Sequence, residues 1–259
     1  MKLDILAFGA HPDDVELGCG GAIFKHTHEG KKIGIIDLTR GELGTRGSVA
    51  IRKIEAEASA KILGVVVREN LEMADGFFVN DKKHQLKVIQ KIRQYQPGLV
   101  IANEPEDRHP DHGRGAKLVS DACFLAGLPK IKTLLKGKSQ KAWRPNAVYH
   151  YIQFNPHTPD FVVDISTHFD KKMEAIRAYR SQFYNPDSKE PETLISSYEF
   201  FNLVKKRCKE HGKLIKNLKF KIKNSNPQSP ILNPTSKVKY GEGFLFGTLH
   251  KNQFENEII

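Results

Sequence analysis

The sequence predicts an α/β fold, with a Rossmann-like, mainly parallel sheet flanked by helices and a C-terminal extension. Strand-like runs rich in β-branched residues alternate with helical patterns along the first two-thirds of the 259 residues, which is the pattern of successive βαβ units. Several of these runs are almost continuously apolar, as expected for strands that helices cover on both faces. At 39% hydrophobic residues, the chain can bury a large core.

Each predicted element follows from local periodicity. The expected strands are 3–9, 32–39, 63–70, 98–104, 146–153 and 161–166. The expected helices are 20–30, 48–62, 81–95, 113–126 and 167–183. In the second helix the apolar residues Ile51, Ile54, Ala58 and Ile62 recur at helical spacing, which favours a helix over these residues.

The C-terminal part has a different character. After residue 211 the regular pattern fades, and a basic, proline-containing excursion is expected at about 212–238. An ordered segment returns at 240–244. With no internal repeat and no second core, we expect one domain over residues 1–259.

The distribution of charge along the sequence bears on whether the protein binds nucleic acid. The 41 Lys and Arg residues exceed the 30 Asp and Glu residues by 11, and residues 205–239 hold a disproportionate share of the positive charge. This segment has no interleaved aromatic residues except Phe220 and matches no nucleic-acid-binding module, so we expect a solvated surface and no nucleic-acid partner.

No run of about 18 apolar residues is present, and the chain opens on a strand pattern instead of a leader, so we expect a cytoplasmic protein without a membrane partner. Cys19, Cys123 and Cys208 are far apart and form no CxxC motif, which argues against a disulfide framework and against a thiolate zinc site.

Two polar segments follow strands of the predicted sheet. Residues 10–14, AHPDD, follow the first strand, and residues 104–112, EPEDRHPDH, follow the fourth. Because the carboxyl ends of parallel strands meet at one edge of a sheet, these segments can converge. Their imidazole and carboxylate groups suit zinc, and three protein ligands leave the open position of a catalytic site. His11, Asp14 and His112 are the natural ligands, with Asp13 placed to accept a proton from the attacking water.

Two other interpretations compete with a metal site. Either histidine–proline–aspartate segment alone can be an ordinary turn. Residues Gly18 to Gly21, with Asp37 at the end of the second strand, suggest a dinucleotide-binding loop. That loop is disfavoured, because Ile23 occupies the third glycine position and Gly18 lies nine residues beyond the strand-end Gly9.

The segments AHPDDVELGCGG, LTRGELGTRG and RHPDH together resemble the zinc-dependent N-acetylglucosamine deacetylase family that includes LmbE-like and PIG-L proteins. The similarity continues through residues 51–64, 164–183 and 240–244, but the stretch at about 212–238 matches no family pattern. Within the family, the chain is most similar to the branch that removes acetyl from N-acetylglucosaminyl malate in bacillithiol biosynthesis.

The resemblance implies one Zn²⁺ per chain, held by His11, Asp14 and His112, although another divalent metal can also suit these ligands. It implies that Asp13 is the general base and that His109 helps to stabilise the tetrahedral oxyanion. It also implies a small-molecule sugar conjugate as substrate and a homo-oligomer, such as a hexamer.

Three further residues are candidates around this site. Arg52 and Arg108 present donors that match sugar hydroxyls or the malate carboxylates, although Arg52 can also be an ordinary arginine on a helix surface. Asp111 either orients an imidazole or caps a helix. The alternative functions are a deacetylase or amidase of another N-acetylglucosamine or thiol conjugate, and a non-catalytic, basic zinc-binding protein.

Overall fold

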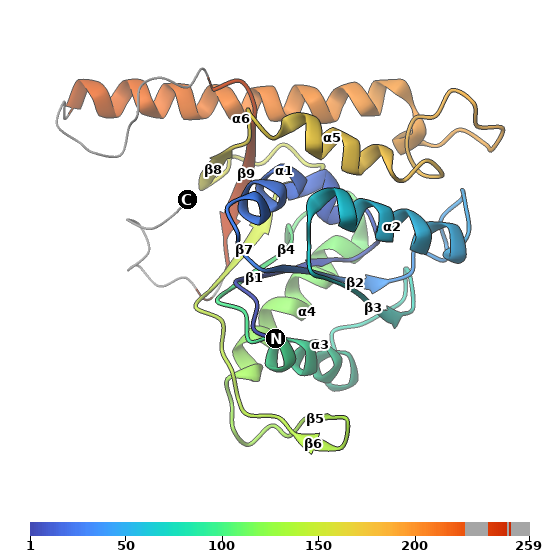
Figure 1. Ribbon diagram of the computed structural model, residues 1–259, viewed down its shortest axis with the longest axis vertical. Coiled ribbons are helices and arrows are strands. Elements are labelled where there is room, and N and C mark those ends of the chain that lie inside the picture. The colour runs from blue at the N-terminus through green and yellow to red at the C-terminus, as the bar shows by residue number, and fades with distance from the viewer. Residues whose placement is uncertain (226–237, 248, 250–259) are drawn as a thin grey trace.

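The central feature of the fold is a mainly parallel sheet. The computed structural model describes residues 1–225, 238–247 and 249, with residues 216–225 described by their backbone alone. Within these residues the sheet has seven strands, in the order β3-β2-β1-β4-β7-β9-β8 (Figure 1). Its strands are β1 Ile5–Gly9, β2 Ile33–Thr39, β3 Val67–Met73, β4 Leu99–Asn103, β7 Ala147–Tyr151, β8 Phe161–Asp164 and β9 Gly241–Phe246. A separate hairpin pairs β5 Leu134–Leu135 with β6 Lys138–Ser139.

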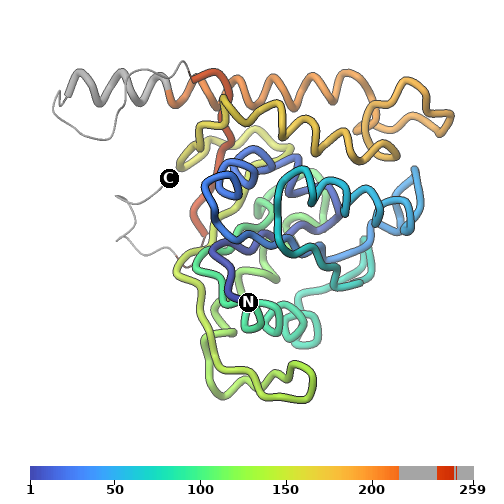
Figure 2. The backbone as a smooth tube through the Cα atoms, viewed as in Figure 1, coloured from blue at the N-terminus to red at the C-terminus, as the bar shows by residue number. Residues whose placement is uncertain are grey.

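The first five strands of the sheet pair in parallel, whereas β9 is antiparallel to both β7 and β8. The red C-terminal strand in Figure 2 therefore lies beside segments from much earlier in the sequence. This arrangement confirms the predicted fold class, and it places the ordered segment at 240–244 inside the sheet.

Helices cover both faces of the sheet. They are α1 Asp14–His28, α2 Val49–Leu63, α3 Lys82–Tyr95, α4 Pro110–Ala126, α5 Phe169–Arg177 and α6 Tyr198–Ser225. Figure 1 shows α1 and α2 on one face and α3 and α4 on the other. Helix α5 packs on α1 and α2, and α6 packs on β8 and β9. Neighbouring strand residues therefore enter different cores: Ile35 joins the cluster beside α1, and Ile36 joins the cluster beside α3 and α4.

The C-terminal helix corrects the predicted excursion at about 212–238. Helix α6 continues to Ser225, and the remainder of the excursion, residues 226–237, lies outside the described residues. The buried stripe of α6 is Phe200, Val204, Cys208, His211 and Ile215. Its spacing of three and four residues crosses residue 211 without a break, so the helix continues beyond the residue at which the sequence pattern fades.

Other boundaries also differ from expectation. Helix α1 begins at Asp14 and not at residue 20, so the glycines lie inside the helix, and its first turn contains the acidic residues Asp14 and Glu16. Acidic groups are favourable there because they face the positive end of the helix dipole. Helix α4 likewise begins earlier, at Pro110, and α5 ends earlier, at Arg177.

Helix α1 is broken in its middle. Cys19 has a φ of −142° and a ψ of 20°, which is not helical. The buried ammonium of Lys172 donates to the carbonyl oxygens of Glu16, at 3.0 Å, and Leu17, at 2.8 Å, on the N-terminal side of the break. A cation therefore satisfies carbonyl groups that the interruption leaves available.

A buried carboxylate accepts hydrogen bonds from backbone groups on the C-terminal side of the same break in α1. Glu242 of β9 accepts from the backbone N–H of Gly21 at 2.9 Å and of Ala22 at 2.7 Å. It also accepts from Lys172 Nζ at 2.6 Å. The two charges thus pair with each other and with the interrupted helix, and they connect α1 to α5 and β9.

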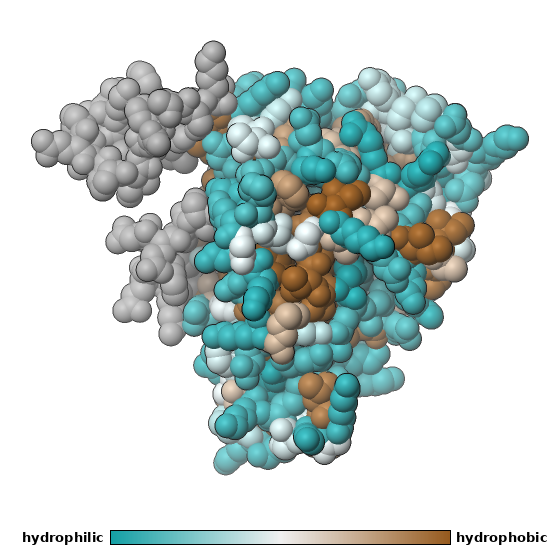
Figure 3. Space-filling view, in the orientation of Figure 1, coloured by the Kyte–Doolittle hydropathy of each residue, from teal (hydrophilic) through white to brown (hydrophobic). Residues whose placement is uncertain are grey.

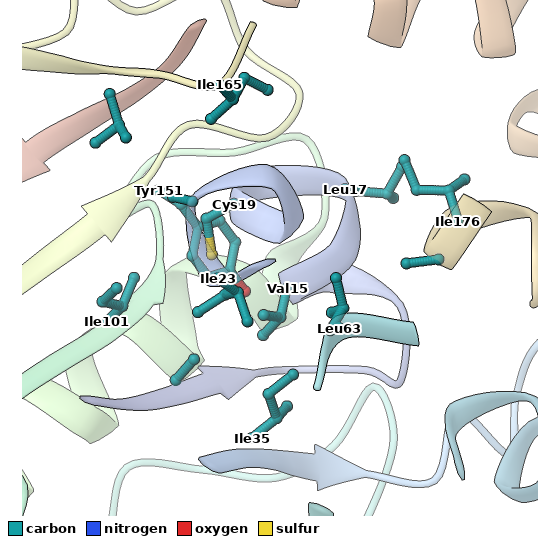
Figure 4. Packing of buried hydrophobic residues seen from close by; sticks show 14 of the residues in the cluster. Val15, Leu17, Cys19, Ile23, Ile35, Leu63, Ile101, Tyr151, Ile165 and Ile176 are labelled. Carbon is teal, nitrogen blue, oxygen red and sulfur yellow. The ribbon is translucent and has the colours of Figure 1, made fainter. Parts of the chain in front are cut away.

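The glycines of α1 allow close packing against the sheet. A Cβ atom at Gly18 would lie 2.1 Å from the ring of Tyr151, and one at Gly21 would lie 2.7 Å from Ile165. Figure 4 shows Tyr151 beside Cys19 at the centre of this packing. The glycine run therefore serves helix–sheet contact.

The outer surface is largely hydrophilic on the face shown in Figure 3, where apolar side chains gather in separate patches. Within the described part of the chain, no helix is both long enough and apolar enough to span a membrane.

Removal of one partner of the buried pair should be strongly destabilising. We predict that Lys172→Met lowers the free energy of unfolding by about 3–5 kcal/mol, because Glu242 would remain as an uncompensated buried charge. Urea unfolding of the purified variant measures the change. The adjacent Lys171 forms an exposed pair with Glu174, so Lys171→Met is the matched control and should change stability little. Equal effects of the two substitutions would contradict this role for Lys172.

Candidate active site

Polar segments that follow β1, β4 and β7 meet at one edge of the sheet. They line a cavity of about 320 Å³. Residues 43–46, from the loop between β2 and α2, form part of its wall, and residues 193–195 form another part. The site therefore lies where parallel α/β sheets commonly bind ligands, at the carboxyl ends of the strands.

Asp14 lies at the centre of the cluster. Its carboxylate accepts hydrogen bonds from the His11 backbone at 2.9 Å, Asn103 Nδ2 at 3.0 Å and Gln153 Nε2 at 2.8 Å. Its two oxygens also face two imidazoles: Oδ2 lies 3.5 Å from His11 Nδ1, and Oδ1 lies 3.2 Å from His112 Nε2. Although burial acts to raise it, the pKa of Asp14 lies well below its usual value, because His112 and His11 stabilise the carboxylate.

The other nitrogen of each imidazole faces a different carboxylate. His11 Nε2 lies 3.1 Å from Asp75 and 3.4 Å from Asp111, and His112 Nδ1 lies 2.6 Å from Asp107. Burial acts to lower the pKa of His112, but Asp14 and Asp107 raise it to about 9. Carboxylates in this position orient the ring and direct the remaining nitrogen toward a metal.

The cluster fits a divalent cation. Among the described residues, potential ligand atoms lie within 4.8 Å of one another in two groups, His11–His109–His112 and His11–Asp75–Asp111. The predicted ligands His11, Asp14 and His112 form neither group, but each oxygen of Asp14 faces one of the two imidazoles. Each of these nitrogens can carry a proton that faces the carboxylate, and a divalent cation bound there would replace those protons. Two imidazoles and one carboxylate are a donor set that zinc accepts.

Asp13 is held in an unusual conformation beside these groups. Its φ is 124°, a region that is strained for a residue other than glycine. Arg52 Nη2 donates to Asp13 Oδ2 at 3.0 Å and to the Pro12 carbonyl at 2.7 Å. Burial raises the pKa of the Asp13 carboxyl to about 7, although Arg52 acts in the opposite direction. A carboxyl group with this pKa can exchange a proton near neutral pH.

The two candidate arginines differ in their surroundings. Arg52 is only 5% exposed, so the alternative of an ordinary surface arginine is wrong. Its guanidinium lines the cavity but donates to protein acceptors, including the Gly41 carbonyl at 3.2 Å. Arg108 lines the cavity and lies 4.8 Å from the ring centre of Phe154. Within the described residues, Arg108 forms no ion pair with a carboxylate, so its donors can reach a ligand.

His109 lines the same cavity and caps α4. Its Nδ1 accepts from the Asp111 backbone N–H at 3.2 Å, so a neutral ring carries its proton on Nε2. Burial lowers the pKa of His109, and the nearby His11 and His112 lower it further. His109 is therefore suited to donate a hydrogen bond as a neutral group. Because His109 is the cap, the helix-capping alternative for Asp111 is wrong, and Asp111 instead contacts His11.

Four supporting residues were not identified from the sequence: Asn103, Gln153, Asp75 and Asp107. A usable signal existed for two of them, because Asn103 ends β4 and Gln153 closely follows the end of β7, both at the edge that was expected to hold the site. Asp107 lies within the second polar segment, but only the structure shows that it contacts His112. Asp75 follows a strand whose end the sequence placed three residues too early.

Comparison with known proteins identifies the family of this chain. Residues 6–123 match the model of the PIG-L family, described as GlcNAc-PI de-N-acetylase. A diacetylchitobiose deacetylase from Thermococcus kodakarensis is 31% identical over 191 residues, which are 69% of this chain and 70% of that protein. A probable N-acetyl-α-D-glucosaminyl L-malate deacetylase 2 from Bacillus cereus is 28% identical over 206 residues, covering 70% of this chain and 84% of the relative.

A solved structure agrees over nearly the whole length. The conserved protein TT1542 from Thermus thermophilus is 32% identical, with a TM-score of 0.76 over 97% of this chain and 98% of that one. The similarity to the malate deacetylase does not exceed that to the diacetylchitobiose deacetylase, so the bacillithiol branch is not distinguished. The family itself is clear: this chain belongs to the PIG-L family of LmbE-like deacetylases, which are carbon–nitrogen hydrolases.

Proposed function

We propose that the protein hydrolyses the acetamide of an N-acetylglucosamine unit in a small glycoside, with one zinc ion per chain. The main support is the position of Asp14 between the facing nitrogens of His11 and His112, with Asp13 adjacent in the sequence. The donor set and the open cavity beside it support a catalytic site in preference to a structural one. The non-catalytic alternative has no comparable support.

The side chains divide the work of amide hydrolysis. His11, Asp14 and His112 would hold the zinc, which supplies Lewis acidity and lowers the pKa of water to about 7 when bound. Asp13 accepts the proton of the attacking water at the oxygen that Arg52 does not bind, and can return it to the leaving amine. His109 donates from Nε2 to the oxygen on which negative charge develops.

We also propose an identity for the group that is attached to the N-acetylglucosamine unit of the substrate. N-acetylglucosaminyl malate is our first candidate, because Arg108 offers a fork of donors that matches a carboxylate. Arg52 adds less support than the sequence suggested, because protein acceptors already use its guanidinium. A second sugar, as in diacetylchitobiose, is the alternative. We also propose a single catalytic domain and a homo-oligomer.

The first test combines metal and substrate. Purified protein should release amine from an N-acetylglucosaminide, lose this activity with a chelator, and regain it with zinc. N-acetylglucosaminyl malate, diacetylchitobiose and free N-acetylglucosamine are compared by kcat/KM. Preference for the malate conjugate would support the first candidate, and preference for the disaccharide would replace it. No release from any of the three, despite bound zinc, would contradict the proposed reaction.

Asp13 should be essential for the reaction and dispensable for the metal. We predict that Asp13→Asn lowers kcat by about a hundredfold to ten-thousandfold, because the amide cannot accept the proton. The amide oxygen can still accept from Arg52, so zinc content and folding should be unchanged. Steady-state kinetics and metal analysis test this together. Near-normal kcat in the zinc-loaded variant would remove Asp13 from its role.

The two contacts of His109 can be separated by substitution. Asparagine can replace its helix-capping function but not its donation from Nε2. His109→Asn should therefore lower kcat by roughly a hundredfold to a thousandfold, with little change in thermal stability. His109→Ala should lose both activity and stability. Loss of zinc from His109→Asn would instead identify His109 as a metal ligand.

A further inference from the structure

The loop 41–47 forms a wall of the cavity without regular secondary structure of its own. Residues Leu43, Gly44, Thr45 and Arg46 line the cavity. Contacts with the rest of the protein must therefore fix the shape of this wall. Its first residue is held by α2, where Arg52 Nη1 donates to the Gly41 carbonyl at 3.2 Å.

A chain of hydrogen bonds leads from α2 to the far end of the same loop. Glu55 accepts from the backbone N–H and the hydroxyl of Ser181, both at 2.7 Å. Gln182 Nε2 donates to Ser181 Oγ and to the Arg46 carbonyl, both at 2.8 Å. Gly47 packs directly against these hydrogen-bonded residues, because a Cβ atom at this position would lie 2.6 Å from Ser181 Oγ. Its φ of 70° also favours glycine.

Glu55 is an unusual residue for a purely structural helix position. It is buried, and among the described residues no cation pairs with it; the side-chain hydrogen bonds that it accepts come from Ser181. A buried carboxylate is unfavourable unless its hydrogen bonds compensate. Glu55 also lies three residues after Arg52, so both side chains leave the same face of α2. Helix α2 therefore contributes to holding one end of the loop through Arg52 and the other through Glu55, although Glu190 also accepts from the Gly47 backbone N–H at 2.8 Å.

We propose that Glu55 is a positioning residue for substrate binding, which acts through Ser181 and Gln182 to fix the loop 41–47. This proposal rests on the proposed function of the cavity. The loop contacts the metal cluster indirectly, because the Leu43 backbone N–H donates to Asp75 at 2.9 Å, whereas the proposed zinc ligands and Asp13 belong to other segments. Disturbance of the hydrogen bonds that start at Glu55 should therefore weaken substrate binding more than the chemical step. The predicted signature is a higher KM at nearly constant kcat.

The decisive variant is Glu55→Gln, which keeps the size of the side chain. The NH2 group that replaces one carboxylate oxygen cannot accept from the Ser181 hydroxyl, so the charge-assisted hydrogen bond from this hydroxyl is lost. We expect faster amide hydrogen exchange in a peptide that covers residues 41–47, and a KM about three- to tenfold higher with kcat within about twofold. Glu57→Gln is the matched control, because Glu57 is an exposed residue of the same helix.

A second comparison tests whether Glu55 acts on the loop through Ser181. Ser181→Ala should raise KM, and the double variant with Glu55→Gln should show less than the product of the two single effects, because both act on one chain. Unchanged exchange in Glu55→Gln, or a fall in kcat at constant KM, would overturn the proposal. If the wild-type protein hydrolyses no acetamide, the proposed function fails, whereas the exchange comparison still decides whether Glu55 fixes the loop.

Discussion

The buried pair of Lys172 and Glu242 is the interaction on which the position of the candidate active site depends. It lies at the break in α1, and that helix begins with Asp14. All three ammonium donors have protein acceptors, namely two helix carbonyls and Glu242, so the cation is fully satisfied. Such completeness matters because the desolvation of two charges is offset only by good geometry. The pair also explains why a strand near the C-terminus belongs to the sheet: β9 supplies the carboxylate that a helix near the N-terminus requires.

Two adjacent aspartates acquire different properties from this framework. Asp14 receives hydrogen bonds and faces two imidazoles, which keep it ionised, whereas burial raises the pKa of Asp13 to about 7. A pair of acids with separated pKa values is a common basis for distinct roles in one site. The positive φ of Asp13 turns the two side chains in different directions, and Arg52 holds that strained residue in place. The sequence motif thus places two carboxylates together, and the surrounding structure distinguishes them.

The sequence was sufficient for the parallel sheet and for the convergence of its two polar segments. Both depend on local information: apolar runs indicate buried strands, and parallel strands end at one edge. Contacts between segments that are distant in the sequence could not be predicted from such local patterns. The burial of Arg52 depends on Pro12, Asp13 and Gly41, and nothing in the pattern of α2 reveals those partners. Helix α6 was not among the predicted helices, because its apolar stripe includes a cysteine and a histidine, which give a weak periodic signal.

Two parts of this chain form the wall of the candidate cavity. The family match covers residues 6–123, which include Asp13, His109 and the three proposed metal ligands. The cavity also needs Phe154, Gln182, Phe200 and residues 193–195, which lie beyond that match. The two parts are joined by buried polar contacts, such as those from Ser181 to Glu55. A related sequence can therefore keep the reaction while its later segments reshape the cavity wall, which is why the motifs identify amide hydrolysis more firmly than they identify the group attached to the sugar.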